Sequence, residues 1–267
     1  RKFNNLPKNI DILTYSFPCQ DLSQQGKQKG INKETRSGLL YEIERILKAN
    51  VNNLPKCLVL ENVKALTTQK FINDFNQWIK VLDKLGYKSK WALLNAKDYG
   101  SAQNRERVFL VSFLKSNPKE FHFPLKIKHN NYFKNIINFK HEHQDCSALL
   151  NFPFLDFKTS KQGITKTILK NYTNFNSEAY IYEPKFFGPT LTASGANSRI
   201  KIYDKKRHKL FFMNAIEAYQ YMGFDKEDGI KIKKSQILSE SKMIFTCGNS
   251  ISVEVLEALF KEVLKCL

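Results

Sequence analysis

The sequence predicts an α/β fold, because short apolar runs alternate with amphipathic segments over its first part. An apolar run at Asp11–Phe17 precedes an amphipathic segment at Gly38–Ala49, and a second apolar run follows at Cys57–Leu60. Short apolar runs are typical of buried strands, whereas apolar residues repeated every three or four positions are typical of helices. The order strand, helix, strand favours a parallel sheet with helices on its faces.

The same alternation continues further along the chain. The segment Phe71–Leu85 has an apolar stripe at helical spacing, and Gly86 supplies a stop signal for that helix. Two further strands are expected at Trp91–Asn95 and Arg107–Leu114. Together these segments complete one α/β domain.

The rest of the chain changes character twice. Residues 116–206 are rich in Asn, Lys, Phe and Tyr, contain several prolines and show little helical periodicity, which indicates a separate small domain. Apolar periodicity then returns over Phe212–Met222, and Val253–Leu264 is typical of a closing helix. We therefore expect residues 1–115 and 207–267 to form one domain, interrupted by the small one.

The charge of the chain indicates a polyanionic partner. Its 43 Lys and Arg residues exceed its 25 Asp and Glu residues, which gives a net charge of +18. Such a charge favours nucleic acid as the partner, although a Lys-rich composition drawn from an AT-rich genome is the alternative. We find no apolar run of about eighteen residues and no signal pattern, so we expect no membrane partner and a cytoplasmic location.

Cysteine usage points in the same direction. The five cysteines are odd in number and widely spaced, which favours a reducing compartment over a disulfide framework. His141, His143 and Cys146 could be read as ligands of a zinc ion, but a second set of clustered ligands is missing. We therefore expect a solvated loop there and no metal.

One cysteine is placed as a nucleophile. Cys19 directly follows an expected strand and Pro18, and it precedes a polar loop with lysines that favour a thiolate. In a parallel sheet it would lie at the carboxyl end of its strand, as Glu61 does. The alternative is an inert, small apolar residue.

Four short motifs follow one another in a telling order: Phe17-Pro18-Cys19-Gln20, Glu61-Asn62-Val63, Gln103-Asn104-Arg105-Glu106-Arg107-Val108 and Gly248-Asn249-Ser250. These motifs and their order resemble those of the DNA cytosine-5 methyltransferases. The sequence of residues 180–202 is similar to that of the CG-specific enzymes of small wall-less bacteria. The resemblance implies a Rossmann-like, S-adenosylmethionine-dependent methyltransferase domain with a small inserted target-recognition domain.

The resemblance implies a role for each catalytic candidate. The Cys19 thiolate would add to C6 of cytosine, Glu61 would be the partner of ring atom N3, and Arg107, with Arg105, would hold the base and the catalytic groups. The alternatives are an ordinary carboxylate at a strand end for Glu61 and a solvated pair beside Glu106 for the two arginines.

S-adenosylmethionine is the implied cofactor. Pro18, Leu39, Asn249 and Ser250 match positions that contact it in the family, although a helix cap would also explain Asn249 and Ser250. The glycine-rich turn that opens such enzymes is missing before Cys19. We therefore expect the first strands to be absent from this chain, which would be the later part of a longer enzyme or one half of a split one.

Double-stranded DNA is the implied substrate, with the target base swung out of the helix. The loop after Cys19 resembles a mobile lid, and its candidate DNA contacts are Gln20, Ser23, Gln24, Gln25, Lys27, Lys29 and Arg36. The small, polar loop that starts at Thr190 suits reading of base edges, and its candidates are Thr190, Thr192, Ser194, Ser198 and Arg199, with Lys201 nearby. A disordered loop and a plain tight loop are the respective alternatives.

These inferences predict methyl transfer to C5 of cytosine in duplex DNA, within CG sites, by a monomer associated with the bacterial nucleoid. The main alternative is a DNA-binding subunit or fragment that is inert without the missing cofactor-binding segment. A thiol hydrolase using Cys19 is more remote, because it needs a histidine partner and the histidines lie outside the sheet motifs.

Overall fold

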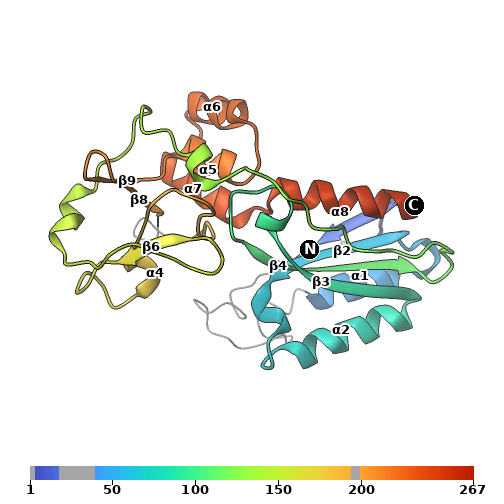
Figure 1. Cartoon of the computed structure of the whole chain (residues 1–267). Coiled ribbons are helices and arrows are strands. Elements are labelled where there is room, and N and C mark those ends of the chain that lie inside the picture. Colours follow the sequence, from blue (N-terminus) through green and yellow to red (C-terminus); the bar gives the residue numbers. More distant parts are fainter. Residues whose placement is uncertain (1–3, 18–39, 194–198) are drawn as a thin grey trace. The chain divides into compact units, whose positions relative to one another are not determined.

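The computed structural model describes residues 4–17, 40–193 and 199–267 (Figure 1). It divides into two compact units. Unit 1 comprises Arg1–Leu94, Glu106–Pro124 and Leu259–Leu267, and unit 2 comprises Asn95–Arg105 and Leu125–Ala258. Residues 207–258 thus fold with the middle of the chain. The division into functional domains at residues 116 and 207 is a separate matter and stays a prediction.

Unit 1 contains the elements expected from the first part of the sequence. The alternation gives, in order, β1 (Ile12–Tyr15), α1 (Leu40–Ala49), β2 (Cys57–Val63), α2 (Ile72–Lys84), β3 (Tyr87–Asn95) and β4 (Glu106–Leu114). The strands form one sheet in the order β1-β2-β4-β3. Short 3-10 helices follow α1 (Val51–Asn53), β2 (Lys64–Thr67) and β3 (Ala96–Asp98).

The prediction of a parallel sheet is confirmed for β1 and β2 and wrong for β4. β1 and β2 are parallel, with Ile12 opposite Cys57, but β4 runs antiparallel to β2, with Val63 opposite Arg107. The reason lies in the connection from β3 to β4, which holds only a short 3-10 helix. A parallel crossover needs a dozen or more residues, usually including a full helix.

The sheet of unit 1 is covered on both faces. On one face Leu58, Leu60 and Leu110 pack with α1 and α2 in a core that includes Phe75 and Leu82. On the other face the carboxyl-terminal part of α8 (Val253–Cys266) runs along the strands (Figure 1). Two covered faces explain why Cys57–Leu60 of β2 and Val108–Val111 of β4 are continuously apolar instead of alternating.

Unit 2 combines a second sheet with short helices. Its strands are β5 (Lys158–Thr159), β6 (Thr165–Ile168), β7 (Tyr180–Tyr182), β8 (Lys201–Asp204) and β9 (Lys209–Phe212), in that order, and only β7 and β8 are paired in parallel. Its helices are α3 (Phe133–Ile136), α4 (Asn176–Ala179), α5 (Ala215–Tyr221), α6 (Lys226–Ser235) and α7 (Glu240–Asn249), with a 3-10 helix at Ser147–Asn151. Ile202, Met213, Tyr221 and Met243 belong to one core, which is why the segment after residue 207 folds with the middle of the chain.

The stretch Glu240–Cys266 has the length and apolar composition of a membrane-spanning helix. It is, however, interrupted between α7 and α8. Met243 and Cys247 are buried in unit 2, and Leu259 and Val263 are buried in unit 1. Packing inside the two units therefore accounts for its apolar residues.

Candidate active site

The carboxyl ends of β1 and β2 are tied together by side chains. Ser16 Oγ donates to the carbonyl oxygen of Glu61 at 2.8 Å, and Asn62 Nδ2 donates to the carbonyl oxygen of Phe17 at 3.1 Å. Asn62 is 2% exposed, so its amide is used inside the protein. These two bonds fix the chain immediately before Pro18 against the end of β2.

Glu61 and Arg107 form an ion pair at this end of the sheet. Val63 lies opposite Arg107 in the antiparallel register, so Glu61, two residues earlier on the same face, is diagonal to Arg107. Arg107 Nε is 3.2 Å from Glu61 Oε1, and the two side chains are 17% and 15% exposed. The structure thus brings together two of the predicted catalytic residues, at a place that is neither fully buried nor loosely solvated.

Glu106 does not join this pair. Its side chain lies 2.9 Å from Lys64 Nζ, in a more exposed position. Arg107 is held from its own strand, because Nη1 donates to the carbonyl oxygen of Glu106 at 2.8 Å. The alternative of a solvated arginine beside Glu106 therefore does not describe Arg107.

Arg105 has different surroundings, which lie within unit 2. The residue is 3% exposed. Its Nη1 donates to the carbonyl oxygen of Leu191 at 2.7 Å, and its Nη2 donates to those of Gly248 and Ser250 at 2.9 and 2.7 Å. One guanidinium thus joins the start of the predicted reading loop to the predicted cofactor motif.

Gln103 and Asn104 reinforce the same connection. Gln103 is fully buried, its Oε1 accepts from Leu191 N at 2.8 Å, and its Nε2 donates to the carbonyl oxygen of Tyr221 at 3.1 Å. Thr190 Oγ1 donates to the carbonyl oxygen of Asn104 at 2.7 Å. The sequence reasoning missed this role of Gln103, although a polar residue inside a motif is a signal that could have suggested it.

The predicted reading loop also touches Gly248 directly. A Cβ atom on Gly248 would lie 2.4 Å from the carbonyl carbon of Thr192, which is far inside van der Waals contact. Only glycine allows this approach. Next to it, Ser250 is the C-cap of α7, and both its amide and its hydroxyl donate to the carbonyl oxygen of Cys247 at 3.0 Å. Asn249 is exposed, so its amide is accessible to a ligand.

Arg199 is engaged inside unit 2. Its guanidinium donates to Gln144 Oε1 at 2.6 Å and to the carbonyl oxygen of Met213 at 3.2 Å, and it lies over the ring of Phe212. Lys201 is 1% exposed and donates to the carbonyl oxygen of Glu178 at 2.7 Å. Both cations stabilise unit 2, so a DNA contact by either would have to compete with these partners.

Several predicted site residues lie outside the described residues. They are Pro18, Cys19, Gln20, Ser23, Gln24, Gln25, Lys27, Lys29, Arg36, Leu39, Ser194 and Ser198.

Three other cysteines are poor nucleophiles because their pKa is raised. Burial raises the pKa of Cys57, Cys146 and Cys247 to about 12 in each case, so these thiols stay protonated at neutral pH. These three thiols are therefore unsuited to nucleophilic attack, and Cys19 stays the predicted nucleophile.

The side chain of His143, which was expected to lie in a solvated loop, is instead buried and bonded within unit 2. His143 Nε2 lies 2.9 Å from Glu217 Oε1, and His143 Nδ1 lies 2.9 Å from the carbonyl oxygen of His141. Within residues 4–17, 40–193 and 199–267, no group of three or more His, Cys, Asp or Glu side chains could hold a metal ion.

Comparison with known proteins supplies the family context. Residues 1–265 match the model of the family described as C-5 cytosine-specific DNA methylase. The chain is 49% identical over 261 residues to the orphan methyltransferase M.SssI of Spiroplasma monobiae, covering 96% of this chain and 66% of that protein. It is 32% identical over 265 residues to the type II methyltransferase M2.ScrFI of Lactococcus lactis subsp. cremoris, covering 96% and 67%. The chain therefore spans about two thirds of the length of these relatives.

Solved structures show the same architecture. The methyltransferase EhMeth of Entamoeba histolytica superimposes with a TM-score of 0.69 at 18% identity, covering 96% of this chain and 77% of the other. The Dnmt2 methyltransferase of S. pombe gives a TM-score of 0.65, also at 18% identity and with the same coverage. These likenesses confirm the predicted methyltransferase fold.

Proposed function

The chain belongs to the family of C-5 cytosine-specific DNA methylases, and from this premise we propose that its protein transfers a methyl group to C5 of cytosine in duplex DNA. The observation that carries this proposal is the Glu61–Arg107 ion pair near the carboxyl end of β2, which is paired in parallel with β1, the strand that Cys19 follows in the sequence. The Glu61 carboxylate and the Arg107 guanidinium, 3.2 Å apart, offer one ligand an acid–base group and a fixed cation.

The proposed reaction begins with attack by Cys19. Its thiolate forms a bond to C6 of the flipped cytosine, and the electron pair of the C5–C6 double bond moves toward the ring nitrogen N3 and oxygen O2. Glu61 in its protonated form gives a proton to N3, and the guanidinium of Arg107 stabilises the charge near O2. Electron density at C5 would then form the new carbon–carbon bond to the methyl group, while the bond from that methyl group to the sulfonium sulfur of its donor breaks and a neutral thioether leaves. Loss of the C5 proton to a base, return of the N3 proton to Glu61 and departure of the Cys19 thiolate restore the aromatic ring.

S-adenosylmethionine would supply the electrophilic methyl group. In the described part of the chain, the exposed amide of Asn249 is open to a polar cofactor, and the half-buried Ser250 lies directly after it at the C-cap of α7. Their role is to bind and orient the cofactor.

We further propose that CG is the recognised sequence and that the loop from Thr190 reads it. The resemblance of residues 180–202 to CG-specific enzymes supports this assignment. So does the anchoring of Thr190 and Leu191 by Gln103, Asn104 and Arg105, because a reading loop must hold its side chains in fixed register against base edges. The protein would act as a monomer on DNA in the bacterial cytoplasm, at the nucleoid.

The experiment that tests the function uses the protein expressed from the complete reading frame that contains this sequence. Labelled methyl groups from S-adenosylmethionine should be transferred to a duplex with one CG site and not to a duplex whose CG cytosines are already methylated. A duplex with 5-fluorocytosine in the CG site should trap a covalent adduct, because fluorine cannot leave as a proton, and peptide mapping should find it on Cys19.

A DNA-binding subunit that does not catalyse is the second candidate, because the net charge of +18 supports DNA binding whether or not the protein catalyses. The same experiment separates the two functions. A protein that binds duplex DNA but neither transfers methyl groups nor forms the adduct would be such a subunit. A protein that does not bind duplex DNA would contradict both.

A further inference from the structure

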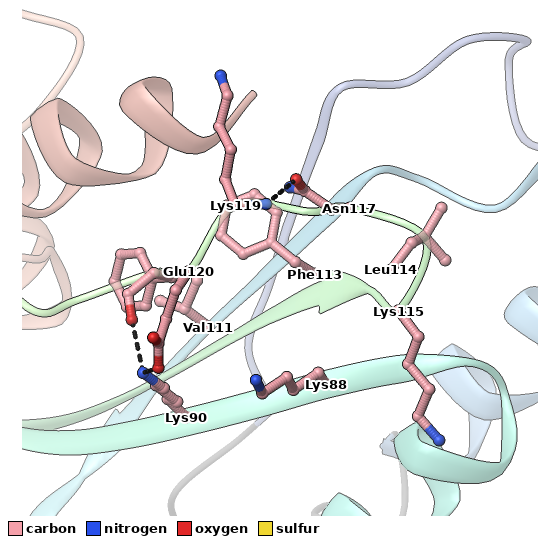
Figure 2. A pocket seen from close by; sticks show the side chains of 10 residues that line it. Lys88, Lys90, Val111, Phe113, Leu114, Lys115, Asn117, Lys119 and Glu120 are labelled. Atoms are coloured by element: carbon pink, nitrogen blue, oxygen red, sulfur yellow. Dashed lines mark hydrogen bonds and ion pairs between the residues drawn. The ribbon is translucent and has the colours of Figure 1, made fainter.

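A pocket of unit 1 is surrounded by lysines (Figure 2). It has a volume of about 130 Å³ and lies between the first residues of β3 and the loop that follows β4. Val111, Phe113 and Phe121 line its apolar part, and its cations are Lys88, Lys90, Lys115 and Lys119. We call this set of four lysines, with the pocket between them, the lysine surface.

Charge in the lysine surface is only partly balanced. Lys90 pairs with Glu120 at 2.7 Å, and Lys115 pairs with Asp83 at 2.8 Å. Lys88 and Lys119 are exposed and form no ion pair with any residue that the structure describes. The lysine surface therefore keeps an excess of positive charge and can accept an anionic partner.

The lysines stand on backbone that is already fixed. Lys115 N donates to the carbonyl oxygen of Gly86 at 2.8 Å, and Asn117 Nδ2 donates to that of Cys266 at 2.8 Å. Asn117 Oδ1 also accepts from Lys119 N at 3.0 Å. Since the loop is ordered before any partner arrives, binding would not have to order it.

The shape of the lysine surface favours an extended anion. Figure 2 shows that Lys115 and Lys119 extend in opposite directions from the loop, while Lys88 and Lys90 project from β3. Ammonium groups spread in this way fit successive phosphates of a backbone better than one small anion. An acidic protein partner would need an apolar anchor, but Phe113 and Phe121 are each only 5% exposed.

The lysine surface is distant from the Glu61–Arg107 pair. Arg107 is at the start of β4 and Phe113 is near its end, and six residues of extended strand span about 20 Å. If a duplex presents its target base to the Glu61–Arg107 end of the sheet, the few base pairs around that base do not reach the lysine surface at the other end.

We propose that the lysine surface is a second DNA-binding surface, which holds the sugar–phosphate backbone of another duplex segment without regard to sequence. The inference rests on the proposed function only in requiring that the protein binds duplex DNA. Such a surface would let the protein keep contact with one segment while it examines another, because phosphate contacts are sequence-independent and exchange readily.

The test measures how many short duplexes bind one protein molecule. A duplex of about twelve base pairs without CG is titrated at low salt, and the stoichiometry is determined by sedimentation. The wild-type protein should bind two duplexes. The dissociation constant of the more weakly bound duplex should lie in the micromolar range that is typical of non-specific binding. The Lys88→Gln/Lys119→Gln protein should bind one. The matched control is Lys80→Gln/Lys84→Gln, which removes two exposed charges from α2 of the same unit and should still bind two.

The salt dependence of the weaker event gives a second measurement. The slope of log K against log salt should fall by about 1 for each lysine replaced, because each phosphate contact releases about one counterion. Binding of one duplex to the wild type, or an unchanged second event in Lys88→Gln/Lys119→Gln, would overturn the inference while leaving the proposed function intact. Saturable binding of inorganic phosphate that depends on Lys88 and Lys119, without a second duplex, would show a small-anion site and overturn it too. A protein that binds no duplex would overturn the proposed function as well.

Discussion

Arg105 Nη2 donates to the carbonyl oxygen of Ser250 at 2.7 Å, from a residue that is 3% exposed. The same guanidinium also donates to Leu191 and Gly248, so three carbonyl oxygens from two distant segments share one cation. Sequence alone places Arg105 beside Arg107 and suggests a common role. The contacts instead give Arg105 a positioning role, in which it holds the start of the predicted reading loop against the end of α7.

Replacing Arg105 by Met should therefore reduce stability. Each of the three carbonyl oxygens would lose a charged donor, and a buried acceptor left without a partner costs about 1 to 3 kcal/mol. We expect a loss of about 3 to 5 kcal/mol in the free energy of unfolding, measured by urea denaturation. Arg107→Met, at a more exposed ion pair, should cost less than about 2 kcal/mol. Equal losses in the two proteins would contradict the positioning role.

Gly248 offers a steric test of the same connection. Gly248→Ala places a Cβ 2.4 Å from the backbone of Thr192, so the loop has to move, at a cost of about 1 to 3 kcal/mol. Gly229 in α6 is the matched control, because a Cβ there meets nothing closer than 3.3 Å. Alanine is the better helix former by about 1 kcal/mol, which offsets a contact that has to shift by only a few tenths of an ångström, so Gly229→Ala should cost clearly less than Gly248→Ala. The prediction fails if urea denaturation shows that the two substitutions have the same effect.

The proposed catalytic role of the Glu61 carboxyl group can be tested by comparison with Glu106, a carboxylate in the same region. Glu61→Gln removes the proton donor for N3 and should reduce the rate of methyl transfer by about 10² to 10⁴, while DNA affinity changes little. Glu106→Gln removes an exposed carboxylate that pairs with Lys64, and it should change the rate by less than about threefold. Single-turnover methylation of a CG duplex gives both rates. Comparable losses would show that Glu61 has no special role.

Part of this architecture could be predicted from the sequence. Apolar runs and amphipathic stripes locate β1, α1, β2, α2, β3, β4 and α8 within a few residues, because burial on covered faces leaves a direct pattern in the sequence. The direction of β4 could not be predicted from the pattern of that strand alone, because an apolar strand reads the same in a parallel and an antiparallel sheet. α6 was missed, because its exposed surface is mostly charged and carries little periodicity.

The candidate site shows the same limit. Glu61 and Arg107 are both predicted to be catalytic, and the register across β2 and β4 explains their contact, while their joint action stays a prediction. Arg199 and Lys201 were expected to face DNA because of their charge, yet Lys201 is almost fully buried and Arg199 is bonded within unit 2. A charged side chain is therefore not always exposed, because a carbonyl oxygen or an aromatic ring can serve as the partner of a buried cation.

The pair of His143 and Glu217 predicts how stability depends on pH. Burial by itself would lower the pKa of His143, but the hydrogen bond and the charge of Glu217 outweigh it, so the pKa is raised above its ordinary value. The folded protein thus binds this proton more tightly than the unfolded chain. The resulting stabilisation is complete below the ordinary histidine pKa of about 6.5 and is lost as the pH rises through the raised pKa.

Urea denaturation at a series of pH values should show this loss in the wild type. Glu217→Gln keeps the shape of the side chain and removes its charge, so the fall above about pH 6.5 should become smaller. Its single amide oxygen can keep the capping bond from Asn214 N but not also the bond from Asn138 N, so the protein should be less stable at every pH. His143→Gln removes the titrating group and should show the same flatter profile. If either protein keeps the wild-type dependence on pH, the buried pair is not its source, and another group must bind the proton on folding.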